Sequence, residues 1–145
     1  MNHTHKHGHG KSVYSETPVR VRYADTDRMG IIYYGTYPVY FEIGRSEFMR
    51  SQGFTYREFE ETGYHLVVVG MDIKYYNSAT YDDLLIVRTS VSSWQSRGLT
   101  FHYEIYKDGS LIVEGHTKHI CISSNRKPAV IPPRLLTILH DVCPR

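Results

Sequence analysis

The sequence predicts one α+β domain in which an antiparallel sheet of five strands wraps around a single long helix. Three observations lead to this prediction. The length of 145 residues suits one domain. One segment has the 3.6-residue apolar period of a helix over about four turns, while the others alternate with the period of two that half-buried strands show. Because the strands that follow the helix have no second long helix between them, an antiparallel sheet packed on the one helix is favoured.

The first strand is predicted over residues 13–24, where Val19, Val21 and Tyr23 alternate with arginine or alanine. Residues 25–30 then read Asp-Thr-Asp-Arg-Met-Gly, a run of turn-forming types. We therefore expect the strand to enter an ordered loop just before the helix begins.

The long helix is predicted to begin after Thr36, a capping residue, with Pro38 in its first turn, and to stop at Gln52-Gly53. Gly44 in its middle costs about 1 kcal/mol relative to alanine, which indicates close packing against another element. A short second helix is predicted over residues 55–61.

Four strands follow, and we expect them to run as a meander in chain order. Asp108-Gly109 is a strong hairpin signal between the last two, and a short helix is predicted at residues 134–140. The segment at residues 99–106 has the clearest alternation, and the segment at residues 66–76 has an irregularity at Gly70. The predicted strands are residues 66–76, 84–94, 99–106 and 111–122.

The charge balance argues against a nucleic-acid partner. The net charge is +2, from 17 Lys and Arg and 15 Asp and Glu, and residues 1–11 contribute Lys6 and Lys11 without any acid. The remaining residues 12–145 therefore have a formal charge of zero, which lacks the basic field of a nucleic-acid-binding domain.

The chain is expected to be cytoplasmic. It has only Cys121 and Cys143, no apolar leader, and no apolar run near the roughly 20 residues that a membrane span needs. Residues 1–11 have alternating histidines and are interpreted as a tag or a disordered tail outside the domain.

No metal or other cofactor is expected. The histidines outside the tail show no zinc-like spacing with cysteines or carboxylates. His102 lies on the polar side of its predicted strand and is expected to be solvated, whereas His119 is expected to be buried. These histidines are His65, His102, His116, His119 and His140.

The densest group of candidate functional residues lies between Tyr23 and Gly35. Asp25 and Asp27 are two residues apart, Gly30 follows, and a helix begins shortly afterwards. Such a loop can be a simple turn, because aspartate side chains bond their own backbone two residues on. The unpaired N–H groups at a helix start could instead polarise an acyl carbonyl, with a nearby carboxylate as nucleophile or base.

Residues 23–37, YADTDRMGIIYYGTY, followed by YFEIGR at residues 40–45, resemble the signature of the 4-hydroxybenzoyl-CoA thioesterase-like branch of the hotdog-fold acyl-CoA thioesterases. The resemblance covers nearly all of residues 12–145. The D-x-D-x-x-G motif joined to F-E-x-x-R is fairly specific, and either half alone would be weak. The fold that it implies is the hotdog, a sheet wrapped around one long helix.

The resemblance implies a role for each residue that matches the motif. Asp27 corresponds to the catalytic carboxylate, as nucleophile or general base, and Asp25 to a structural residue that caps the loop or pairs with an arginine. The backbone N–H groups of Tyr34 and Gly35 correspond to those that face the thioester oxygen, although many relatives have histidine at the position of Tyr34. Gly30 and Tyr33 are expected to contact the substrate.

Glu42 and Arg45 match the F-E-x-x-R half of the signature. Because they are three residues apart on one helix, an ion pair between them is the favoured interpretation, with water positioning by Glu42 as the alternative.

Coenzyme A would place its phosphates near the turn that contains Arg97, the favoured phosphate contact, with Lys118, Arg126 and Lys127 as further candidates. Trp94 and Tyr75 are expected in the core or at an interface.

The expected activity is hydrolysis of an acyl thioester to a free acid and a thiol, with the CoA thioester as substrate. An acyl-carrier protein is the alternative thiol carrier. The resemblance implies a homodimer or homotetramer, in which the partner's residues 64–76 line the acyl pocket. Two other functions stay open. A hotdog 3-hydroxyacyl dehydratase would need a histidine base, and none lies between His9 and His65; a non-catalytic acyl-thioester binding protein would use Asp27 only as a turn residue.

Overall fold

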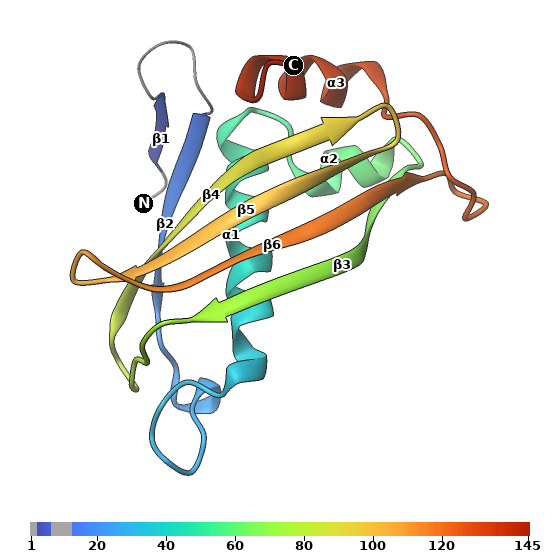
Figure 1. Ribbon diagram of the computed structural model, residues 1–145. Helices are drawn as coiled ribbons and strands as arrows, with labels where there is room; N and C mark the ends of the chain where they lie inside the picture. Colours follow the sequence, from blue (N-terminus) through green and yellow to red (C-terminus); the bar gives the residue numbers. More distant parts are fainter. Residues whose placement is uncertain (1–2, 7–12) are drawn as a thin grey trace.

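The computed structural model describes residues 3–6 and 13–145. A curved antiparallel sheet lies across the long helix α1, and α3 covers one end of the molecule (Figure 1). The helices are α1 (Tyr37–Ser51), α2 (Tyr56–Glu61) and α3 (Pro133–Val142), with two 3-10 turns, η1 (Tyr23–Asp25) and η2 (Tyr34–Thr36). The strands are β1 (His3–Lys6), β2 (Val13–Arg20), β3 (His65–Tyr75), β4 (Leu84–Gln95), β5 (Gly98–Lys107) and β6 (Ser110–Ile122). The predicted wrapping of a sheet around one long helix is confirmed.

The order of strands across the sheet is β1-β2-β4-β5-β6-β3, so the predicted four-strand meander is wrong for β3. The connections β4–β5 and β5–β6 span only two residues each, and such short loops force neighbouring strands to pair. The connection from β3 to β4 spans residues 76–83, which is long enough to pass the ends of β5 and β6, so β3 and β4 need not be neighbours. As a result β3 pairs with β6 and forms one edge, with the predicted irregularity at Gly70.

The other edge is β1, which pairs antiparallel with β2. The prediction that residues 1–11 lie outside the fold is therefore wrong for His3–Lys6. Without β1, β2 would be the edge strand and would have unpaired N–H and C=O groups, and a neighbouring segment can pair with such groups without any apolar signal of its own. The other residues of the predicted tail, 1–2 and 7–11, lie outside the described residues.

The helix packs closely on the sheet at Gly44, as its sequence position predicted. A Cβ atom at this position would come within 2.5 Å of Oγ1 of Thr89 and 2.8 Å of Cγ1 of Val87, both on β4. One turn away, the ring of Phe41 stacks on Tyr103 of β5 at 4.2 Å between centroids. These contacts fix α1 against the middle of the sheet, and so fix where the start of the helix lies.

Candidate active site

The loop between β2 and α1 folds back on itself. β2 ends at Arg20, earlier than predicted, and η1 takes up residues 23–25. The N–H of Asp27 donates to the carbonyl of Ile31 (2.8 Å), and the N–H of Tyr33 donates to that of Asp25 (2.9 Å). Residues 26–32 therefore form a small closed lobe whose two ends are pinned together next to α1.

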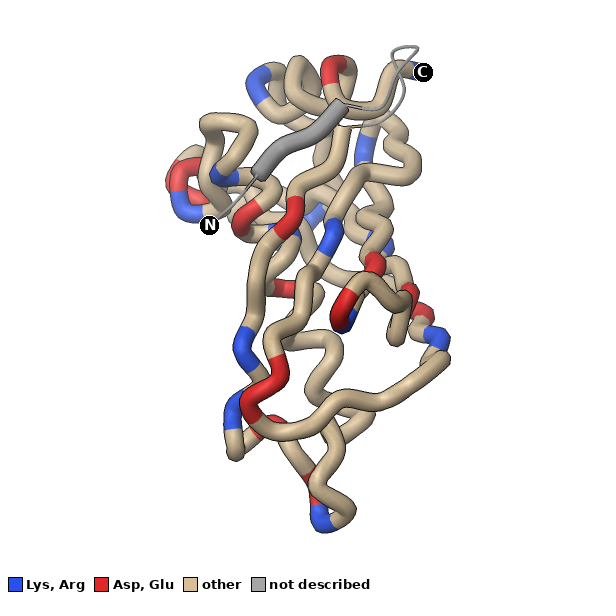
Figure 2. The backbone as a smooth tube through the Cα atoms, turned by 90° about the vertical axis from the view of Figure 1, so that its left-hand side faces the viewer, with Lys and Arg blue, Asp and Glu red and all other residues tan. Residues whose placement is uncertain are grey.

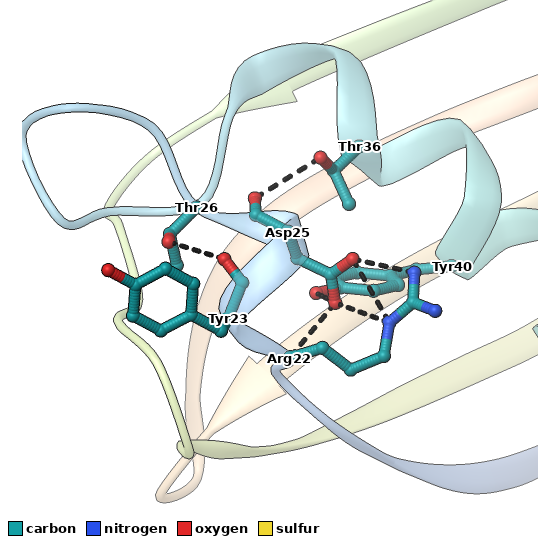
Figure 3. Close-up of polar contacts among 6 residues, drawn as sticks. All are labelled: Arg22, Tyr23, Asp25, Thr26, Thr36 and Tyr40. Carbon is teal, nitrogen blue, oxygen red and sulfur yellow. Dashed lines mark hydrogen bonds and ion pairs between the residues drawn. The ribbon is translucent and has the colours of Figure 1, made fainter.

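Asp25 anchors this lobe just after the end of β2. Its carboxylate is 2% exposed and accepts hydrogen bonds from the backbone N–H (3.0 Å) and the guanidinium of Arg22 (2.8 Å) and from the hydroxyl of Tyr40 on α1 (2.9 Å). The carbonyl of Asp25 also accepts from the Thr36 hydroxyl (3.2 Å) (Figure 3). Thr36 precedes α1 as predicted, but its side chain holds the loop instead of capping the helix. The structural role expected for Asp25 agrees with these contacts.

The surroundings of Asp25 favour its charged form. Burial by itself raises the pKa of this carboxyl, but the hydrogen bonds from Arg22 and from Tyr40 outweigh it and hold the pKa below its ordinary value. Burial and the contact with Asp25 in turn raise the pKa of Tyr40, so that its hydroxyl stays protonated as a donor. No local pattern in the sequence singles out Tyr40 for this role, because it lies fifteen residues from Asp25 along the chain.

Asp27 has much weaker restraints. It is half-buried, and one of its oxygens accepts the N–H of Met29 (2.8 Å), the local aspartate turn that its position suggested. The N–H of Gly30 closes the turn onto the carbonyl of Asp27 (3.0 Å) at a φ of +81°, a conformation that glycine adopts without strain. Asp27 and Gly30 line a hollow of about 540 Å³ with Tyr23 and Tyr81. Asp27 therefore borders open space.

The first N–H groups of the helical segment that leads into α1 belong to Tyr34 and Gly35. Within the described residues neither N–H has a hydrogen-bond acceptor, which is the usual state of the first donors of a helix. Both residues are exposed, and the ring of Tyr33 lies 4.6 Å from that of Tyr34. These donors carry the partial positive charge of a helix start and can polarise a bound oxygen.

An aromatic hollow of about 400 Å³ opens beside these donors. Its walls include Tyr34, Tyr37, Tyr75 and Tyr76, and the hydroxyl of Tyr75 donates to the carbonyl of Tyr34 (3.2 Å). Tyr75 is exposed and lines this hollow, so of the two places expected for it the core is wrong, and an interface stays a prediction. Burial, followed by the nearby Tyr75, raises the pKa of Tyr37 to about 12, so the phenol stays neutral at physiological pH.

Arg97 and Lys118 lie together in another hollow of about 480 Å³, around the hairpin between β4 and β5. Figure 1 shows this hairpin at the opposite end of the sheet from the loop between β2 and α1. The structure therefore brings the two predicted phosphate contacts together but keeps them apart from Asp27 within one chain.

The predicted ion pair between Glu42 and Arg45 is absent from the described residues. The salt bridge on this helix joins Glu47 to Arg50 (3.4 Å). The charge of Arg45 instead lies near the hydroxyls of Tyr56 and Tyr103, in the layer between α1 and the sheet. Helical spacing alone could not distinguish the two outcomes, because it does not show which polar groups the sheet presents to the helix.

His119 is buried, as predicted, with its Nε2 atom 2.8 Å from the hydroxyl of Thr117. Burial, and then the charge of Arg45, lowers the pKa of His119 to about 4, so this imidazole is neutral at physiological pH. Trp94 is also in the core, and its indole N–H donates to the carbonyl of Cys143 (2.7 Å).

Charges of both signs are interspersed along the chain on the side shown in Figure 2. None of the helices in the described part of the chain combines the length and the apolar character needed to cross a membrane.

Comparison with known proteins identifies the class. The model of the thioesterase-like superfamily matches residues 21–139, so the chain belongs to this family. A putative esterase from Aquifex aeolicus is 33% identical over 122 residues, which cover 84% of this chain and 94% of the relative. The acyl-CoA thioesterase YbgC from Haemophilus influenzae is 32% identical over 127 residues, covering 86% and 93%.

Solved structures of similar proteins have the same fold. A hypothetical protein from Thermus thermophilus superposes with a TM-score of 0.85 at 32% identity, covering 88% of this chain and 98% of that one. A DHNA-CoA thioesterase from Staphylococcus aureus superposes with a TM-score of 0.82 at 33% identity, covering 89% and 87%. The hotdog fold expected from the resemblance is thereby confirmed.

Proposed function

We propose that this protein is an acyl-CoA thioesterase that uses Asp27 as its catalytic carboxylate and the N–H groups of Tyr34 and Gly35 as the carbonyl-polarising donors. The observation that supports it most directly is the contrast within the loop between β2 and α1. Asp25 accepts hydrogen bonds from Arg22 and Tyr40 and acts as an anchor, while Asp27 lines an open hollow and is close in sequence to two helix-start N–H groups that have no acceptor among the described residues.

The chemistry follows from these groups. Two N–H donors at the thioester oxygen stabilise the negative charge that develops when the carbonyl carbon is attacked. In one route Asp27 removes a proton from water, the hydroxide attacks, the C–S bond breaks and the thiolate leaves to be protonated. In the other, Asp27 attacks directly, expels the thiolate, and the resulting anhydride is hydrolysed by water. Both routes need the same ionised carboxylate.

The aromatic hollow beside the donors is the proposed acyl site. Tyr34, Tyr37 and Tyr75 offer ring faces, and the raised pKa values of Tyr37 and Tyr75 keep those two hydroxyls protonated, which suits an aromatic or other flat acyl group. One of the similar structures is a thioesterase for an aromatic thioester, DHNA-CoA. We propose CoA as the carrier because Arg97 and Lys118 together form a basic site suited to its phosphates.

We further propose a homodimer that pairs two β3 edges antiparallel. β3 forms an edge of the sheet and exposes large apolar side chains, among them Val69 at 52% and Met71 at 50%. Such an edge is a template for pairing with a second chain.

This pairing would complete the site. Along one chain, the start of β3 lies near the hairpin of Arg97, since Val67 and Gly98 both pair with Ile120, while Tyr75 at its end contacts Tyr34. Reversing a second β3 alongside the first would therefore bring Arg97 of the partner subunit towards Tyr34 and Asp27 of this one.

The test is thiol release from a panel of aromatic and aliphatic acyl-CoAs, comparing the wild type with Asp27→Asn. Asparagine keeps the shape of the side chain and the acceptor for the Met29 N–H, but has no charge for either route. We expect kcat to fall by about 10²-fold or more with an unchanged melting temperature. Equal activity in the variant would reject Asp27 as the catalytic carboxylate, and a wild type inert on every acyl-CoA would reject the CoA thioesterase.

The same assay tests the shared site. Arg97→Ala should raise KM and leave kcat nearly unchanged, because a phosphate contact is the same in the ground and transition states. Mixing Asp27→Asn chains with Arg97→Ala chains should then restore low-KM activity, since one of the two sites in a mixed dimer has both residues. No recovery after mixing would contradict a site shared between subunits.

A further inference from the structure

A second group of ionisable side chains lies on the face of the sheet that points away from α1. Phe101, Tyr103 and Ile105 of β5 are buried, so the alternate residues His102 and Glu104 point to the opposite face. In the register of β5 with β6, His102 lies opposite His116 and Glu104 lies opposite Glu114. The pairing thus places two imidazoles and two carboxylates in one compact square.

Three of these side chains converge. The Nε2 atom of His102 is 2.8 Å from Oε2 of Glu114, and a carboxylate oxygen of Glu104 joins them so that all three donor atoms lie within 4.8 Å of one another. The side chains of His102 and Glu104 are each 24% exposed, and that of Glu114 is 33% exposed. Among residues 13–145, whose side chains the structure describes, no other set of three His, Cys, Asp or Glu donors comes this close.

The arrangement places like charges together. Two carboxylates directly opposite on neighbouring strands destabilise a sheet unless a cation lies near them. The guanidinium of Arg88 is 4.0 Å from Glu104, but it is closer to Glu16 (3.1 Å) and stacks over the ring of Tyr14. Glu114 contacts His102 and the hydroxyl of Tyr76 (3.3 Å). Arg88 thus reaches Glu104 only at the longer distance, and Glu104 also contacts the hydroxyl of Tyr106. Each carboxylate has two oxygens with several lone pairs, so these contacts leave sites that can accept a metal ion.

An imidazole with two carboxylates is a ligand set that Zn²⁺ accepts, at about 2.0–2.2 Å from each atom. Donors around such an ion are about 3.3–3.6 Å apart, so modest rotation of two surface carboxylates would close the present spacing. A second imidazole stands beside the group, since the rings of His102 and His116 are 4.9 Å apart. Nδ1 of His116 is held by Asp72 (3.0 Å), the kind of carboxylate contact that orients metal-binding histidines.

We propose that His102, Glu104 and Glu114 bind one Zn²⁺ ion, which would join β5 to β6 on the outer face of the sheet. The three proposed ligands have no assigned part in the hydrolysis and lie on the face of the sheet away from α1. The two sites meet at Tyr76, which lines the aromatic hollow and donates its hydroxyl to Glu114. Residue spacing along the chain does not reveal it, since the two glutamates and the histidine are brought together only by the register of two strands.

The test must exclude the histidines of the N-terminal segment, which could bind zinc on their own. We would therefore use the full chain with His3, His5, His7 and His9 all replaced by asparagine, treated with a chelator and titrated with Zn²⁺ by calorimetry. We expect saturable binding of one ion per chain, an increase in melting temperature on adding Zn²⁺, and at least tenfold weaker binding in Glu104→Gln. Co²⁺ as a probe should give the visible absorption of a protein-bound ion.

The matched control is His65→Gln in the same background. His65 also pairs with a carboxylate, Glu60 (3.2 Å), but has no third donor within the described residues, so its loss should leave zinc affinity unchanged. Glu104→Gln removes one of two opposed charges and should fold normally, and Glu114→Gln repeats the test independently. No saturable binding in the asparagine background, or an affinity in both glutamine variants equal to that of the unsubstituted background, would overturn the proposal.

Discussion

Asp25 and Asp27 are the same residue type, two positions apart in one loop, yet their surroundings differ completely. Asp25 is buried and accepts hydrogen bonds from the backbone and side chain of Arg22 and from Tyr40. Asp27 is half-buried and accepts one, from the N–H of Met29 next to it in the turn. The first carboxylate ties the loop to α1, and the second is held only within the loop.

The difference suits the two carboxylates to different roles: Asp25 to stabilising the loop and Asp27 to reacting with a substrate. A carboxylate with all its acceptor sites in use is a poor nucleophile or base, but it fixes its neighbours in place. A carboxylate with free oxygens can reach a substrate, provided that something else holds the loop still. We infer that Asp25 positions the lobe on which the proposed role of Asp27 depends, so the two residues should respond in opposite ways to substitution.

The largest effect on stability is expected for Asp25→Ala. It removes the acceptor of Tyr40 and of the Arg22 N–H, and hydrogen bonds to a charged group contribute about 1.5–3 kcal/mol each. We expect a loss of about 3 kcal/mol or more in the free energy of unfolding by urea denaturation. Asp27→Ala, which removes one contact in a partly exposed turn, should lose about 1 kcal/mol or less. Equal losses in the two variants would contradict the anchoring role of Asp25.

A smaller effect on the free energy of unfolding is expected when the pH is lowered. Because the folded-state pKa of Asp25 lies below its ordinary value near 4, this residue contributes stability above that value and loses it as pH falls through the folded-state pKa. The difference in unfolding free energy between the wild type and Asp25→Asn should therefore be constant above about pH 5 and shrink steadily below about pH 4. Thermal melts of both proteins from about pH 3 to about pH 7 measure this, and a difference that does not change with pH would refute it.

Much of the fold could be predicted because its signals are local. The helix α1, the hairpin at Asp108-Gly109 and the close packing at Gly44 all follow from residue types at short spacing. The pairing of β3 with β6 could not be predicted, because an eight-residue connection does not determine which strand becomes the neighbour. The anchoring of the loop after β2 could not be predicted either, because the carboxylate of Asp25 bonds Tyr40, which is fifteen residues away.

In the candidate site, too, only the grouping of residues that are close along the chain could be predicted from the sequence. Asp27, Gly30 and the helix start were visible as a cluster in the sequence because they are close along the chain. Tyr75 joins them only through the fold, and Arg97 and Lys118 meet each other across strands at the far end of the sheet. The group of His102, Glu104 and Glu114 likewise requires the cross-strand register.

The smallest effect is expected for Gly30→Ala, which tests whether the turn conformation inside the lobe matters for activity in addition to the anchoring of the lobe by Asp25. Gly30 has a φ of +81°, and a Cβ atom there would have no heavy atom within 4 Å, so Gly30→Ala meets only backbone strain, about 1 kcal/mol. Gly53 has the same geometry, a φ of +80° with open space, at the end of α1 and away from the lobe. Gly53→Ala should therefore lower stability by a similar amount and leave thiol release unchanged, whereas Gly30→Ala should also lower kcat severalfold, because it distorts the turn that holds Asp27. If both variants retain full activity, the conformation at Gly30 is unimportant for Asp27, and the anchor at Asp25 alone accounts for the position of the lobe.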